Sequence, residues 1–160
     1  MYFEYRNKIY IKHMFGPLFF GFTSKFQELI KELDPDVKVL IIRMERVPYI
    51  DQSGAYAMEE SVIHLHELGV VVVVTGINSQ PLDMLKKIDV IPGLITEGCL
   101  FKEFEDCELW LKYNLRSKSG GFEKILQSSH EGREKIFSKK LRRWVHAKPG
   151  KEKKGNSETS

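Results

Sequence analysis

The chain has 160 residues, of which 42% are hydrophobic and 29% charged, a composition that suits one folded domain with an appendage. Its longest unbroken apolar run covers only Val70–Val74, far short of the roughly 20 apolar residues of a membrane span. The first 15 residues alternate charged and apolar groups, so we expect no signal peptide. We therefore expect the two cysteines, Cys99 and Cys107, to be reduced thiols rather than a disulfide.

The charge is distributed unevenly along the chain. Residues 1–114 carry 12 Lys/Arg and 17 Asp/Glu, which gives −5, whereas residues 115–160 carry 13 Lys/Arg and 5 Asp/Glu, which gives +8. We therefore predict a mildly acidic domain at residues 1–115, followed by a basic C-terminal extension at residues 116–160.

The first half of the domain predicts a strand, a helix and a second strand. Lys8–Met14 alternates with period two, as a half-buried strand does, and "GPLFFG" ends it. Thr23 or Ser24 can cap the helix that follows. Val37–Met44 is β-branched and almost entirely apolar, which is typical of a buried parallel strand.

The second half continues the alternation of helices and strands. The turn Asp51–Gly54 precedes a second helix that Gly69 ends, and Val70–Thr75 is the clearest strand of the chain. The turn Gly76–Ser79 opens a third helix with Pro81 in its first turn. The second helix has its apolar face at Ala55, Met58, Val62, Leu65 and Leu68; its Glu59 and Glu60 are expected on a solvated face.

The end of the domain is less regular. "ITEGCLF" is short and ambiguous, and "KEFEDCELWLKYNL" predicts a fourth helix with an apolar stripe at Phe104, Cys107, Leu111 and Leu115. Strands that alternate with helices predict an α/β fold with a mostly parallel central sheet and right-handed crossovers. Sites in such sheets gather beyond the carboxyl ends of the strands, where Asp51–Gly54 and Gly76–Ser79 lie.

Three motifs make the chain resemble a STAS domain over roughly residues 5–115. They are "GPLFFG", "VLIIRMERVPYIDQSGAYAM" and "VVVVVTGIN". The resemblance implies the STAS fold, with about four helices flanking the sheet. This fold is shared by bacterial anti-sigma-factor antagonists and the cytoplasmic C-terminal domains of SulP-type anion transporters, and "GPLFFG" favours the transporter branch.

The residues Asp51, Gln52, Ser53 and Gly54 form the regulatory, partner-facing loop that the resemblance implies. In the antagonist branch the residue after the motif's aspartate is the serine that a partner kinase phosphorylates, and here that position is Gln52. This departure also favours the transporter branch. Helix capping by Asp51 and Ser53 explains the same residues without a further function, and the two roles can coexist.

No other motif predicts catalysis, a metal or a cofactor. The turn of Gly76, Ile77, Asn78 and Ser79 could present N–H groups to an anion or a nucleotide phosphate, although an ordinary strand-to-helix turn accounts for it better. The five histidines have no partner at metal-ligand spacing. A small flavodoxin-like enzyme is disfavoured because no set of catalytic groups converges, so we predict that the domain is not an enzyme.

One helix is predicted in the C-terminal extension. Glu134–Lys148 predicts a basic amphipathic helix, which is either docked on the domain or bound to an anionic membrane surface. The segment before it is linker-like, and the last twelve residues are expected to be disordered. Nucleic-acid binding is not expected, because no recognition fold accompanies the basic patch. The side chains expected at the membrane surface are Lys135, Lys139, Arg142, Arg143 and Trp144.

The expected function is that of a non-catalytic regulatory or interaction domain of a SulP-type sulfate or related anion transporter, at the cytoplasmic face of the membrane. The resemblance implies the transmembrane domain of the same transporter as partner, with a cytosolic regulatory protein and weak nucleotide binding as further options. The alternative is a free-standing STAS protein that binds a kinase-type anti-sigma factor.

Overall fold

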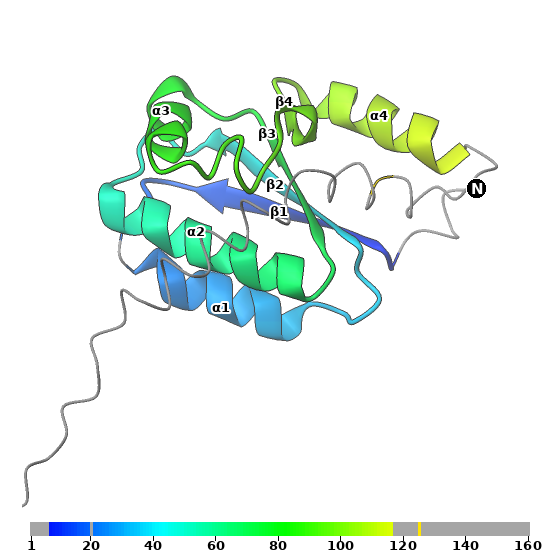
Figure 1. Ribbon diagram of the computed structural model, residues 1–160, viewed down its shortest axis with the longest axis horizontal. Coiled ribbons are helices and arrows are strands. Elements are labelled where there is room, and N and C mark those ends of the chain that lie inside the picture. The colour runs from blue at the N-terminus through cyan, green and yellow to red at the C-terminus, as the bar shows by residue number, and fades with distance from the viewer. Residues whose placement is uncertain (1–6, 20, 117–124, 126–160) are drawn as a thin grey trace, which may run out of the picture.

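The computed structural model describes residues 7–19, 21–116 and 125 (Figure 1). The order of the elements is that of a βα repeat, and the last strand is only two residues long. The elements are β1 (Ile9–Phe15), α1 (Phe22–Glu32), β2 (Val39–Arg46), α2 (Gln52–Glu67), β3 (Val71–Thr75), α3 (Ser79–Lys87), a 3-10 turn (Glu97–Cys99), β4 (Leu100–Phe101) and α4 (Phe104–Arg116).

The four strands form one parallel sheet in the order β1-β2-β3-β4. The two central strands pair from Val39 with Val71 to Arg43 with Thr75. The prediction that both are buried strands of a parallel sheet is confirmed, although β2 runs from Val39 to Arg46 rather than from Val37 to Met44. The mostly parallel α/β fold expected from the sequence is therefore confirmed.

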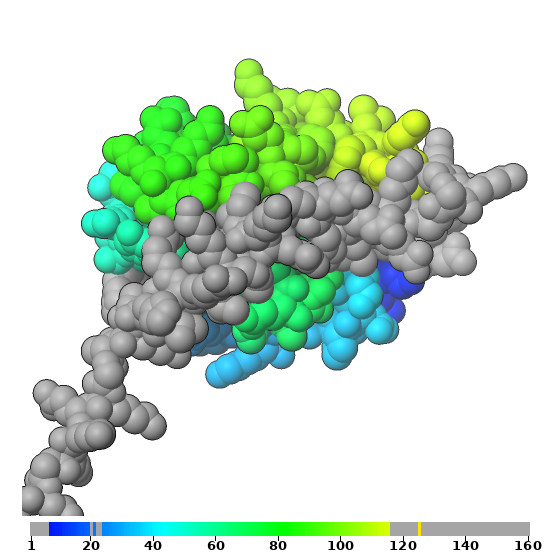
Figure 2. Space-filling model, viewed as in Figure 1, coloured from blue at the N-terminus to red at the C-terminus, as the bar shows by residue number. Residues whose placement is uncertain are grey.

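Helices α1 and α2 lie side by side against the sheet, while α3 and α4 lie beyond β3 and β4 (Figure 1). Figure 2 shows the same division on the molecular surface, with α3 and α4 in its upper part and α1 and α2 in its lower part. All crossovers start at the carboxyl end of a strand. The three connections that follow β1, β2 and β3 therefore meet at one edge of the sheet.

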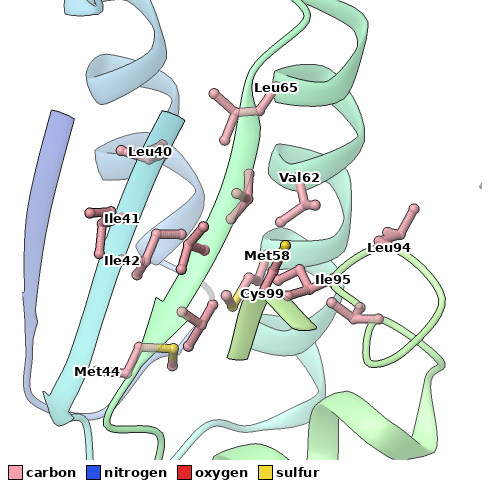
Figure 3. Close-up of a cluster of buried hydrophobic side chains, with 14 of the residues drawn as sticks. Leu40, Ile41, Ile42, Met44, Met58, Val62, Leu65, Leu94, Ile95 and Cys99 are labelled. Carbon is pink, nitrogen blue, oxygen red and sulfur yellow. The ribbon is translucent and has the colours of Figure 1, made fainter. Parts of the chain in front are cut away.

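The core lies between the central strands and α2. Figure 3 shows Met58, Val62 and Leu65 of α2 turned toward the strands, and all three are at most 1% exposed. The predicted apolar face of this helix is thus confirmed except at its end. Leu68 is the C-cap of α2 and is 54% exposed, because the chain leaves the helix there for the turn at Gly69.

Two further expectations need correction. Helix α1 begins at Phe22 with Gly21 as N-cap, so neither Thr23 nor Ser24 caps it; the Ser24 hydroxyl instead donates to the Gly21 carbonyl at 3.0 Å. Glu59 does not lie on a solvated face: it is only 6% exposed, whereas its neighbour Glu60 is exposed.

One residue of the C-terminal extension belongs to the core. Ile125 is 1% exposed and is part of the same apolar cluster as the strands and α2. The predicted helix at Glu134–Lys148 lies outside the described residues, and the division at residue 115 stays a prediction.

Candidate functional site

The site begins at the first turn of α2. Asp51 is the N-cap, in extended backbone conformation, and its Oδ1 accepts from the Gly54 amide at 2.6 Å. Gln52 and Ser53 are the first residues of the helix, and both are exposed. The capping role predicted for Asp51 is therefore present, and it leaves the side chains of Gln52 and Ser53 on the surface.

Gly54 lets two connections approach each other closely. It is buried, and a Cβ at this position would collide with the Leu18 carbonyl. Leu18 lies in the β1–α1 connection, where its amide donates to the Tyr49 carbonyl at 2.9 Å and its carbonyl accepts from the Asp51 amide at 3.2 Å. The β1–α1 connection therefore runs alongside the segment before α2, as an extension of the sheet, and glycine is needed where α2 meets it.

The start of α3 holds the same segment from the other side. The Gln80 side chain accepts from the Ile50 amide at 2.8 Å and donates to the Ile50 carbonyl at 2.9 Å. The Asn78 side chain donates to the carbonyls of Val47, at 2.8 Å, and Glu45, at 3.3 Å. These bonds satisfy backbone groups at and after the end of β2, beyond the last pair between β2 and β3 at Arg43 and Thr75.

The contacts of Asn78 give the β3–α3 turn a structural role. Asn78 is the N-cap of α3 by position, but its side chain makes no capping hydrogen bond and is turned toward the segment before α2. Gly76 has a positive φ of 65° and lies against the Glu45 side chain, which itself pairs with Arg43 at 3.0 Å. The turn of Gly76, Ile77, Asn78 and Ser79 thus holds the neighbouring connection, and its use as an anion or nucleotide contact stays a prediction.

An aromatic patch lies on the surface beside these connections. We give this name to Phe15, Phe19 and Tyr49, which are 61%, 51% and 43% exposed. The rings of Phe19 and Tyr49 are 6.2 Å apart, and the Arg46 guanidinium lies 5.3 Å from the Phe15 ring centroid. Phe15 ends β1, while Phe19 and Tyr49 belong to the two connections that Leu18 joins. Clustered exposed aromatic side chains of this kind mark interaction surfaces.

A groove of about 610 Å³ adjoins the patch, between β1 and α1. Its walls are mixed in character: Phe15 and Phe19 line it together with the cations Lys12 and Lys25 and the carboxylates Glu28 and Glu32. The aromatic residues around position 19 are visible in the sequence as part of "GPLFFG". The contact of Phe19 with Tyr49 could not be predicted, because it joins two connections that are far apart along the chain.

A match to a family model shows to which protein family the chain belongs. The model for the STAS domain matches residues 3–97, which is more than half of the chain. The chain belongs to the STAS domain family. The resemblance predicted from the three motifs is thereby confirmed.

Solved structures of STAS domains share this fold. A sulfate transporter family protein from Wolinella succinogenes is 26% identical, with a TM-score of 0.60, over 66% of this chain and 85% of that one. The SulP transporter STAS domain from Vibrio cholerae is 24% identical, with a TM-score of 0.60, over 69% of this chain and 86% of that one. A search of the curated proteins found no significant match.

A complete transporter also contains the fold. The structure of murine Solute Carrier 26 family member A9, an anion transporter in the inward-facing state, matches 66% of this chain with 20% identity and a TM-score of 0.59. The match covers only 18% of the transporter chain. The STAS domain thus resembles those of sulfate and other anion transporters.

The remaining predictions concern metal sites, membrane spans and the basic side chains of the C-terminal extension. Among the described residues, no group of three or more His, Cys, Asp or Glu side chains is placed to hold a metal ion. No helix in the described part of the chain is long and apolar enough to cross a membrane. Lys135, Lys139, Arg142, Arg143 and Trp144 lie outside the described residues, so their membrane contact stays a prediction.

The two cysteines are free and buried. Burial raises the pKa of Cys107 to about 12 from its ordinary value of 9.0, with smaller contributions from Cys99 and Glu108. A thiol that stays protonated at neutral pH is a poor nucleophile, so Cys107 acts as a core residue of α4.

Proposed function

We propose that this STAS domain is the non-catalytic regulatory domain of a SulP-type transporter of sulfate or a related anion, and that it acts at the cytoplasmic face of the membrane. The observation that carries the proposal is the likeness to the sulfate transporter family protein from Wolinella succinogenes, which extends over 85% of that chain. The described part of this chain contains no membrane span, so transport itself would require a separate membrane domain, which is its first proposed partner.

The exposed edge formed by the connections after β1 and β2 is the proposed partner surface. It combines the aromatic patch of Phe15, Phe19 and Tyr49 with the polar turn of Asp51, Gln52, Ser53 and Gly54. Aromatic side chains provide contact area with little loss of conformational freedom, and the neighbouring polar groups provide orientation. This arrangement suits a protein partner better than a small molecule, because the side chains of Gln52 and Ser53 are exposed in the first turn of α2.

The alternative function is that of a free-standing STAS protein that binds a kinase-type anti-sigma factor. The exposed Ser53 hydroxyl in the first turn of α2 is the observation that favours it, since a kinase could reach this side chain. Gln52 argues against it, because the position that carries the phosphorylated serine in antagonists has no hydroxyl here.

The coding region around this chain distinguishes the two functions. Ten or more apolar spans in the same reading frame support the transporter, whereas an adjacent gene for a kinase-type anti-sigma factor supports the alternative. The partner surface is then tested by anion uptake through the complete transporter with Tyr49→Ala. Tyr113→Ala is the matched control, because Tyr113 is 77% exposed on α4. Reduced uptake with Tyr49→Ala alone supports the surface, and equal uptake with both variants rejects it.

A further inference from the structure

We infer that the groove between β1 and α1 is a surface through which two copies of this chain associate. A two-fold axis sets the groove of one copy against the groove of the other, so that Lys25 of each copy lies opposite Glu32 of its partner. The inference concerns self-association of the domain, and it does not depend on the transporter assignment.

Exposed apolar side chains are concentrated along β1 and the connection that follows it. Of the nine large hydrophobic side chains that are exposed in the described part of the chain, four lie between positions 10 and 19: Tyr10, Ile11, Phe15 and Phe19. β1 is at one end of the strand order, and within the described residues it pairs with β2 alone. Clustered apolar exposure of this kind is typical of a surface that binds another protein.

The groove carries opposite charges at its two ends. Because α1 leads from the end of β1 back to the start of β2, it runs in the opposite direction to β1. With about 3.3 Å per strand residue and about 1.5 Å per helix residue, Lys12 and Glu28 share the middle of the groove. Lys25 lies toward the end of β1, whereas Glu32 lies near Tyr10, toward the start of β1.

A second copy is the occupant that this charge pattern fits. A uniformly acidic or uniformly basic partner would meet a like charge at one end of the groove. A two-fold axis through the middle reverses the direction of the second groove, so each cationic end meets an anionic end. Among the described residues, none of the four charged side chains in the groove forms an ion pair within its own copy, so all four are available: Lys12, Lys25, Glu28 and Glu32.

The same charges oppose the dipole of α1. The helix spans Phe22–Glu32, so Lys25 lies in its first turn and Glu32 is its last residue. A helix is stabilised by negative charge at its start and by positive charge at its end, and both are reversed here. The isolated domain gains nothing from this arrangement. Two α1 helices that pack in opposite directions gain an ion pair at each end.

Sedimentation velocity of the full chain at low ionic strength measures the self-association, and we expect a monomer that becomes a dimer as the protein concentration rises. Lys25→Glu and Glu32→Lys should each raise the Kd of the dimer at least about tenfold, because by symmetry each replaces two attractions with two repulsions. Lys31→Glu is the matched control, since Lys31 is exposed on the same helix and lies outside the groove. It should leave the Kd unchanged.

A mixture of the two variants separates pairing across the interface from any effect on the fold. In a dimer of Lys25→Glu with Glu32→Lys, the two introduced charges attract each other, and so do the two native ones. The mixture should therefore associate with about the Kd of the full chain, although each variant alone does not. Urea unfolding should show neither variant to be less stable than the full chain, because each removes a charge that opposes the helix dipole.

The inference fails if the full chain stays monomeric at every concentration, which would leave the groove to a different occupant. It also fails if the mixture associates no better than each variant alone. Dimers that Lys25→Glu and Glu32→Lys leave intact would place self-association on another surface and would equally overturn it. Anion uptake with Tyr49→Ala is a separate measurement, and Tyr49 is not part of the groove lining, so the proposed function and this inference can fail independently.

Discussion

The Gln80 side chain offers the sharpest test of how the site is held together. Its amide bonds to both backbone groups of Ile50, at 2.8 and 2.9 Å, and Ile50 is fully buried. Gln80→Ala removes both hydrogen bonds and leaves a buried N–H and a buried C=O without their partner. Each bond contributes about 1 kcal/mol net, and each buried group left unsatisfied costs about 1–3 kcal/mol.

We expect Gln80→Ala to lower the free energy of unfolding by about 2–6 kcal/mol, the sum for two buried groups left unsatisfied, reduced slightly by the higher helix propensity of alanine. Urea unfolding followed by circular dichroism measures this value. Ser79→Ala is the matched control, because Ser79 is exposed at the adjacent position of α3, and a surface change of this kind costs less than about 0.5 kcal/mol.

The variant Gln80→Glu separates the two hydrogen bonds. A carboxylate can still accept from the Ile50 amide, but it cannot donate to the Ile50 carbonyl. Protonation restores a donor, so the pKa of the new carboxyl should be raised above its unfolded value of about 4.3. The lost stability should return as the pH falls below about 4 and should disappear again as the pH rises through the raised pKa. Equal stability of Gln80→Ala and Ser79→Ala would refute the claim that the Gln80 side chain holds the Ile50 backbone in place.

Three further predictions concern function and chemistry. Incubation with a kinase of antagonist STAS domains should give no phosphoryl adduct by intact-mass analysis, because Gln52 lacks a hydroxyl; stoichiometric modification of Ser53 would favour the alternative function. Iodoacetamide at pH 9 should modify Cys107 only after unfolding, because burial raises the pKa of this thiol to about 12. Between pH 9 and 12 the thiol ionises only in the unfolded state, so the free energy of unfolding should fall as the pH rises. The full chain should sediment with anionic liposomes better than residues 1–133, because four basic side chains of residues 134–148 contribute about 4 kcal/mol; equal sedimentation, or binding to neutral lipid in high salt, would contradict it.

The sequence predicted those features that depend on local patterns. The β-branched runs of β2 and β3 predicted buried parallel strands, because a strand covered on both faces has no polar alternation. Asp51 was predicted as a cap because its carboxylate can reach an amide in the first turn of the helix. The two turns at the edge of the sheet followed from the same order of elements.

The contacts between the turns could not be predicted in this way. Gln80 and Ile50 are thirty residues apart, and a glutamine at the start of a helix gives no sign that its amide serves another backbone. Asn78 resembles an ordinary cap, yet its side chain serves Val47 instead. Ile125 was missed because the glycines and serines around it are typical of a linker. Such partners depend on the packing of the whole domain, which no local pattern encodes.

The hydrogen bonds between the connections also bear on how the proposed partner surface could work. Leu18, Asn78 and Gln80 fix the backbone on both sides of the segment that carries Tyr49 and leads to Ser53. A partner that binds this edge would therefore meet a preformed backbone, and little binding energy would be lost in ordering it. The same hydrogen bonds, from the Leu18 backbone and from the Asn78 and Gln80 side chains, would pass a change at one connection to its neighbours. Anion uptake by the complete transporter with Gln80→Ala should then fall as it does with Tyr49→Ala, although Gln80 lies outside the aromatic patch. Normal uptake at a temperature where the variant is still folded would mean that the partner does not depend on the fixed geometry of this edge.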